Sequence, residues 1–214
     1  MNFKLRDSLK GYLEFALSFF NKSIKIKLKV KKDIIKIIPD VNAIDIGASY
    51  FPHGKWNVFL KSKKTFWTAV DPNVHNLNYV KEWHWPSKIN KFGEAISTKT
   101  GEQTLYITNV DSGSSLLKPL LNRKIYHRWD KSYFFPSKES KIEVRSLNDL
   151  ITNMPDNFNI LKLDTQGTEF DILKSLDEKF WNKIICVELE SNLNYEPSYE
   201  NSSNINQVFK FFRK

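Results

Sequence analysis

The sequence contains almost no cysteine, which excludes several kinds of covalent or metal stabilisation. Cys186 is the single cysteine among 214 residues, so the chain forms neither an internal disulfide nor a zinc site built from several thiolates. It stands in the apolar run 184–187, where we expect it to be a buried side chain. A lone cysteine fits a reducing compartment, and a cytoplasmic location is the expectation.

The sequence also lacks a long hydrophobic run. The apolar stretch 15–20 is far shorter than the roughly 20 residues that a membrane-spanning helix needs. The N-terminal residues show no signal-peptide pattern. With 41% hydrophobic residues, 16 Phe, 8 Tyr and 6 Trp, the chain is instead expected to fold around one sizeable core.

Basic charge is concentrated at the N-terminus. Residues 1–42 carry ten Lys or Arg against four Asp or Glu, whereas residues 43–214 are close to neutral. Apolar residues at helical spacing between Phe3 and Phe20, followed by alternating lysines up to Lys31, predict a helix and then a strand. We expect this basic arm, residues 1–42, to pack on the domain; peripheral contact with an anionic membrane is the alternative.

Residues 43–214 alternate short apolar runs with helical patterns. Strands are expected at 43–47, 65–70, 88–96, 159–163 and 184–189, shorter β segments at 103–108 and 141–145, and helices at 73–82, 170–176 and 205–212. Such alternation predicts an α/β, Rossmann-like fold with a mostly parallel sheet flanked by helices. Ligands of these sheets bind at the carboxyl ends of the strands, where acidic residues recur in this sequence.

The glycine fingerprint of dinucleotide-binding proteins is missing after the first expected strand. Asp45, Gly47 and Ala48 stand there with only Gly54 nearby, so no glycine-lined cradle for a pyrophosphate is present. An acid in this turn favours a ligand with positive charge. The amino and sulfonium groups of S-adenosylmethionine meet that requirement.

Acidic residues also follow the second and third expected strands. Asp71 is placed to accept the hydroxyls of a ribose, with a helix N-cap as the alternative role. Glu94 and Ala95 stand near the carboxyl end of the third expected strand and could face an adenine ring. Together these positions predict a nucleoside-binding crevice.

The order of several segments resembles the FkbM-type methyltransferases. They are residues 45–48, 95–102, 114–116, 144–150, 162–169 and 187–190. The most specific is Lys-Leu-Asp-Thr-Gln-Gly-Thr-Glu at 162–169, followed by apolar residues at helical spacing. The resemblance spans roughly residues 41–212.

This resemblance implies a Rossmann-like methyltransferase that uses S-adenosylmethionine to methylate hydroxyls of sugars, glycans or related small metabolites. By similarity, Asp45, Gly47 and Ala48 would contact the methionine part and Asp71 the ribose. Glu94 and Ala95 would lie near the adenine, and Asp164 at the centre of the active site. The chain departs from the family in having Gln166 where Glu is frequent. It also ends after a helix, so the closing β-hairpin usual in such folds is expected to be missing.

Three residues are candidates for the general base that a hydroxyl acceptor requires. Asp164, at the end of the central strand, is the first, Glu190 from the neighbouring strand is the second, and His53 is the third. Thr168 begins a helix that Asp164 could instead cap. No metal site is predicted, although Asp164 and Glu190 together leave a divalent ion conceivable.

Two other classes of protein compete with this interpretation. The basic arm and the aromatic residues would suit a nucleic-acid-modifying protein, but the near-neutral body and the lack of a base-stacking motif argue against a nucleic-acid partner. A Rossmann-like protein that binds a ligand without turnover is the other alternative. The sequence leaves the oligomeric state open.

Overall fold

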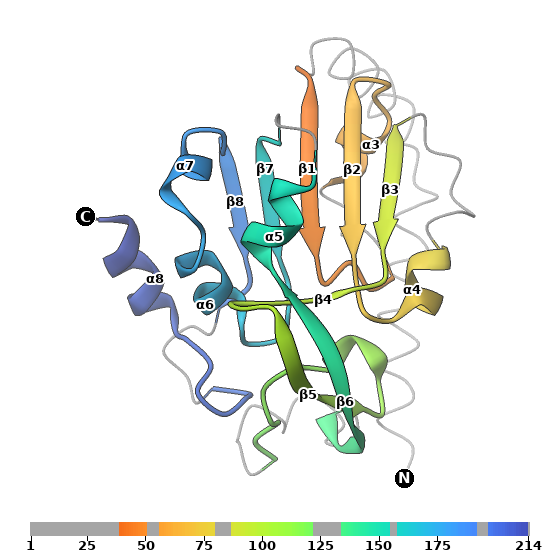
Figure 1. Ribbon diagram of the computed structural model, residues 1–214, viewed down its shortest axis with the longest axis vertical. Helices are drawn as coiled ribbons and strands as arrows, with labels where there is room; N and C mark the ends of the chain where they lie inside the picture. The colour runs from red at the N-terminus through yellow and green to blue at the C-terminus, as the bar shows by residue number, and fades with distance from the viewer. Residues whose placement is uncertain are drawn as a thin grey trace, which may run out of the picture. The chain divides into compact units, whose positions relative to one another are not determined.

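The structure is a computed structural model that describes residues 39–50, 56–79, 87–121, 134–154, 158–191 and 197–213 (Figure 1). The helix and strand expected in the basic arm lie outside these residues, and so does His53. The boundary between arm and domain therefore stays a prediction.

A five-stranded sheet forms the centre of the molecule, with the strand order β3-β2-β1-β7-β8 (Figure 1). Every pairing in it is parallel. Its strands are β1 (Val41–Ile46), β2 (Thr65–Val70), β3 (Lys88–Phe92), β7 (Ile160–Leu163) and β8 (Cys186–Leu189). The helices are α3 (Asn57–Leu60), α4 (Val74–Tyr79), α5 (Leu147–Thr152), α6 (Glu169–Lys174), α7 (Glu178–Trp181) and α8 (Ile205–Phe212). The predicted α/β, Rossmann-like class is confirmed.

The direction of the strand order reverses between β1 and β7. From β1 the chain proceeds outward through β2 to β3, and it later returns to the other side of β1 as β7 and then β8. A reversal of this kind opens a crevice at the carboxyl ends of the two central strands, because their connections diverge to opposite sides. The backbone N–H of Asp164 donates to the carbonyl of Ile46 at 2.9 Å, so the two strand ends stay together there.

A second, three-stranded sheet corrects the prediction of one strand at 88–96. That stretch divides at Gly93: β3 belongs to the central sheet, whereas β4 (Ala95–Ser97) pairs with β6 (Pro136–Ser146). A Cβ at Gly93 would lie 2.6 Å from Val74 Cγ2, so the break occurs where α4 packs closely. β6 is also longer than the expected 141–145, because it pairs along β5 (Gly101–Thr108).

The main core lies between the central sheet and its flanking helices. Ile44, Leu161 and Leu163 of the two central strands pack in one cluster with Leu147 of α5 and Ile172 of α6. All of these side chains are fully buried. Cys186, predicted to be buried, is exposed. It belongs to the edge strand β8, where no further strand covers it among the described residues.

Truncating a core isoleucine tests this arrangement. We expect Ile44→Ala to lower the free energy of unfolding by about 2–5 kcal/mol, because Ile44 is completely buried and leaves a cavity. Ile185→Ala removes the same atoms from a side chain that is 85% exposed and should change it by less than about 0.5 kcal/mol. Urea denaturation measures both; equal losses would contradict the proposed core.

Candidate active site

The ends of β1 and β7 approach each other so closely that only glycine fits at position 47. Gly47 has φ of +78°, in the left-handed region. A Cβ at this position would lie 1.9 Å from the carbonyl oxygen of Asp164. The Gly47 and Ala48 N–H groups both donate to the Val70 carbonyl, at 2.8 and 3.1 Å. Gly47 thus joins the ends of β1, β2 and β7 in one layer.

A cavity of about 180 Å³ opens at this layer. Its wall includes four acidic residues, namely Asp71, Glu94, Asp111 and Asp164. No lysine or arginine is present among the described residues of the wall. Ala95, Ile96 and Leu105 give it an apolar side. The cavity therefore suits a ligand that combines positive charge or N–H and O–H donors with an apolar part.

A buried chain of charges lies beneath the cavity. Asp45 is completely buried and accepts hydrogen bonds from Lys162 Nζ at 2.8 Å and Trp67 Nε1 at 3.3 Å. Lys162 Nζ also lies 3.6 Å from Asp164 Oδ2. Burial raises the pKa of Asp45, against the pull of Lys162. Burial opposes the charge of Lys162, but Asp45 and Asp164 hold the pKa of Lys162 above its usual value. Lys162 thereby couples a core carboxylate to a cavity carboxylate.

Asp71 is buried in the cavity wall at the end of β2. Its Oδ1 accepts the backbone N–H of Asn73 at 2.8 Å, but it does not cap α4, because Asn73 precedes that helix and its own Oδ1 accepts the N–H groups of His75 and Asn76. Burial, together with the charges of Asp45 and Asp111, raises the pKa of Asp71 to about 6. The carboxylate therefore combines a structural hydrogen bond with an unneutralised charge that faces the cavity.

The loop after β7 is fixed by its own side chains. Gln166 has φ of +60°, and its Nε2 donates to Asp164 Oδ1 at 3.1 Å and to Glu190 Oε2 at 3.4 Å. The Tyr199 hydroxyl lies 3.0 Å from Gln166 Oε1 and 2.9 Å from the Gly113 carbonyl oxygen. Gln166 therefore links the two predicted base candidates to the far wall of the site.

Two further carboxylates differ in role. Glu169 is buried and accepts the backbone N–H groups of Thr165 and Gly167, each at 2.9 Å, so it closes the loop and does not line the cavity. Burial raises the pKa of Glu169. Glu190 keeps an exposed surface, but its carboxylate is partly buried. This burial and the neighbouring Asp164 raise the pKa of Glu190.

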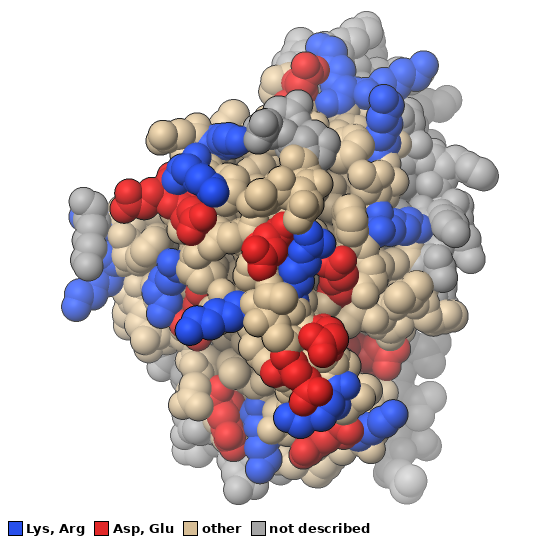
Figure 2. All heavy atoms as spheres, in the orientation of Figure 1, with Lys and Arg blue, Asp and Glu red and all other residues tan. Residues whose placement is uncertain are grey.

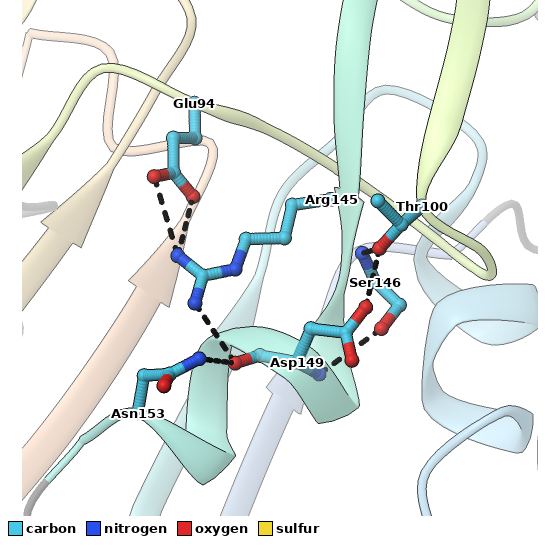
Figure 3. A network of polar contacts seen from close by, with 6 residues as sticks. All are labelled: Glu94, Thr100, Arg145, Ser146, Asp149 and Asn153. Carbon is cyan, nitrogen blue, oxygen red and sulfur yellow. Dashed lines mark hydrogen bonds and ion pairs between the residues drawn. The ribbon is translucent and has the colours of Figure 1, made fainter.

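Glu94 reaches the cavity from the turn between β3 and β4. Its carboxylate pairs with Arg145 of β6, whose Nη1 lies 3.1 Å from Glu94 Oε2 (Figure 3). The adjoining Ala95 is buried and lines the same cavity. Both residues predicted near an adenine ring are therefore on its wall.

The structure brings together most of the residues that the sequence singled out. Gly47, Asp71, Glu94, Ala95 and Asp164 line one cavity. Asp45 and Ala48 lie buried next to it. Glu190 reaches it through Gln166. Contact of any of these residues with a cofactor stays a prediction.

Sequence reasoning gave no role to several residues that the site uses. They are Lys162, Arg145 and Tyr199. Lys162 had a signal, because a lysine inside an otherwise apolar strand requires a buried acidic partner. Tyr199 had none, since its contacts depend on the path of the chain after β8. Within the described ranges, no three His, Cys, Asp or Glu side chains are grouped to hold a metal ion.

Comparison with known proteins defines the class to which this fold and site belong. The FkbM methyltransferase domain model matches residues 45–214, and the chain belongs to this family of methyltransferases. The chain is also similar to "Methyltransferase 1" of Beauveria bassiana (strain ARSEF 2860), with 35% identity over 54 residues. That match covers 24% of this chain and 22% of the fungal protein. No solved structure gives a significant match.

Replacing Gly47 tests the close approach of β1 and β7. Both Gly47→Ala and Gly101→Ala place a side chain at positive φ, but a Cβ at Gly101 would meet no atom within 4 Å. We therefore expect Gly47→Ala to lower the free energy of unfolding by at least about 2 kcal/mol more than Gly101→Ala. Chemical denaturation compares the two variants. Equal losses of unfolding free energy would show that the contact with Asp164 does not restrict position 47 to glycine.

The raised pKa of Asp71 predicts a pH dependence of stability. Because the folded chain holds this proton up to about pH 6 and the unfolded chain loses it near 3.8, stability from this group falls as pH rises between these values. Asp71→Asn keeps an oxygen acceptor for Asn73, and we expect it to stabilise the protein at pH 8 by about 3 kcal/mol at most. Urea denaturation at pH 4 and pH 8 measures this; a destabilised variant at pH 8 would contradict it.

Proposed function

We propose that this methyltransferase uses S-adenosylmethionine to methylate a hydroxyl of a sugar, glycan or related small metabolite. The observation that carries the proposal is the acidic cavity at the ends of β1, β2 and β7, where Gly47 lets the backbone approach a ligand. Its described wall has no cation to repel a sulfonium or an amino group. The acceptor class rests on the family resemblance.

The residues on the wall fit the parts of this donor. Asp71 stands at the end of β2, where a carboxylate accepts ribose hydroxyls in nucleoside-binding α/β proteins. Glu94 combines with the apolar Ala95 to suit the edge and face of an adenine. The methionine part would lie against Gly47 and Ala48. Asp45 would contribute from beneath the cavity, because its carboxylate holds the Lys162 ammonium in place.

The donor supplies a methyl group activated by its sulfonium, and the protein must hold the acceptor oxygen in line with it. Asp164 is the proposed general base that takes the hydroxyl proton, an effect worth roughly 10²–10⁴-fold in rate. The ammonium of Lys162 lies 3.6 Å from Asp164 Oδ2 and helps to hold the carboxylate in place. Glu190 is the second candidate, because its raised pKa favours the protonated form, which does not accept a proton. His53, the third, lies outside the described residues.

The distribution of surface charge supports a nucleic-acid partner less well than a small-molecule acceptor. On the face shown in Figure 2, acidic and basic side chains are interspersed and do not gather in one basic patch. Nucleic-acid binding needs such a patch to contact phosphates. No helix in the described part of the chain is long and apolar enough to cross a membrane. Cytoplasmic location, membrane contact by the basic arm and the absence of a metal remain predictions from the sequence.

Calorimetry with S-adenosylmethionine tests the donor site. We expect wild-type protein to bind it and Asp71→Asn to bind at least about tenfold more weakly at pH 8, because one charged hydrogen-bond acceptor is lost. Asp177→Asn is the matched control, since this exposed side chain does not line the cavity. Absence of binding by wild-type protein would refute the proposal.

Turnover requires a second experiment with labelled donor and a panel of free sugars, glycans, nucleotide sugars and lipid-linked sugars. On any acceptor that is methylated, Asp164→Asn should keep donor affinity and lose at least about 100-fold in rate. Donor binding without transfer to any acceptor would favour the alternative of a ligand-binding protein without turnover. Full activity of Asp164→Asn would transfer the role of base to Glu190 or His53.

A further inference from the structure

Arg145 joins the cavity to a polar network around helix α5. Its Nη1 donates to both oxygens of Glu94, at 3.3 and 3.1 Å, and its Nη2 donates to the carbonyl of Asp149 at 2.9 Å (Figure 3). One guanidinium therefore connects a carboxylate on the cavity wall to helix α5. The segment 144–150, which carries part of the family resemblance, contains both Arg145 and Asp149.

The far end of this connection is held in place by further hydrogen bonds. The carbonyl of Asp149 also accepts from Asn153 Nδ2 at 2.7 Å, and the carboxylate of Asp149 accepts from the hydroxyl of Thr100. The Thr100 hydroxyl accepts the Ser146 N–H at 2.9 Å, and the Ser146 hydroxyl accepts the Asp149 N–H at 3.0 Å (Figure 3). Arg145 is thus directed toward Glu94 by a fixed backbone.

Glu94 keeps acceptor capacity after this pairing. A carboxylate offers about four lone-pair positions, and the described contacts use one N–H-bearing nitrogen of Arg145. The apolar residues Ala95, Ile96 and Leu105 line the same cavity. A flat ring that carries an N–H donor at its edge matches an acceptor beside an apolar surface.

We propose that Arg145 is a positioning residue that holds Glu94 as the acceptor for the exocyclic amino group of the donor's adenine. This inference rests on the proposed function. Arg145 then gives the site its preference for an adenine over a ring with a carbonyl at the same place. A carbonyl oxygen there would face the Glu94 carboxylate without a hydrogen between them.

A purely structural role for Arg145 predicts a different result. The side chains of Arg145 and Glu94 are 25% and 36% exposed, and ion pairs with this much contact with water add little to stability. If the pair served only to hold β6 against the β3–β4 turn, its loss would weaken binding of every ligand alike. A comparison of two ligands that differ only in the purine ring therefore distinguishes a positioning role of Arg145 from a purely structural one.

The experiment measures the affinities of S-adenosyl-L-homocysteine and its deaminated counterpart, S-inosyl-L-homocysteine, by calorimetry. Wild-type protein should prefer the adenine compound by at least about tenfold, and Arg145→Ala should reduce that preference by about tenfold. Glu94→Ala should reduce it as much, and the double variant no further, since both act through one contact. Arg145→Lys, which keeps a charge without the planar fork, should restore part of the preference.

Lys141→Ala is the matched control. Lys141 is a cation on the same strand whose ion pair with Glu102, at 3.9 Å, does not line the cavity, so the preference should be unchanged. An unaltered preference in Arg145→Ala, or an equal loss of affinity for both compounds, would overturn the role assigned to Arg145 while leaving the donor site intact. Failure of wild-type protein to bind either compound would instead refute the proposed function itself.

Discussion

The site depends on the contact between Gly47 and the carbonyl of Asp164, where the ends of the two central strands meet without space for a Cβ. Because β1 and β7 pair in parallel, their next residues emerge side by side, and the reversal of strand order leaves a crevice above them. Asp71 and Asp164 reach this crevice because β2 and β7 are the two neighbours of β1. A bulkier residue at position 47 would separate the strands that bring these acids together.

Electrostatic repulsion accompanies this arrangement. Four acids lie on one wall, and no described cation lines the cavity itself, although Arg145 pairs with Glu94 and Lys162 contacts Asp164 from outside the wall. Burial, and to a lesser extent the charges of Asp45 and Asp111, raises the pKa of Asp71. Lys162 offsets part of the repulsion from below by contacting Asp45 and Asp164. Such a wall is less stable than an apolar one, which is a usual consequence of building a functional site.

The fold followed from local pattern wherever a strand is buried on both faces. Residues 160–163 are all buried, and the sequence shows them as a run that is apolar apart from Lys162 and ends at Asp164. The pattern failed where pairing depends on distant segments. The stretch 88–96 reads as one strand, but its last residues pair with Val144 and Arg145, some fifty positions away in the sequence. Cys186 looks like a core residue, yet the edge position of β8 leaves it exposed.

The sequence by itself determined the alternation of strands and helices and the acids that follow the strands, because each is written in neighbouring residues. Tertiary structure decided which acids face the cavity and which are paired in the core. Asp45 and Asp71 look alike in the chain, but one is paired with Lys162 in the core and the other faces the cavity. Their roles differ because strand order and side-chain direction, not residue type, set what each carboxylate meets.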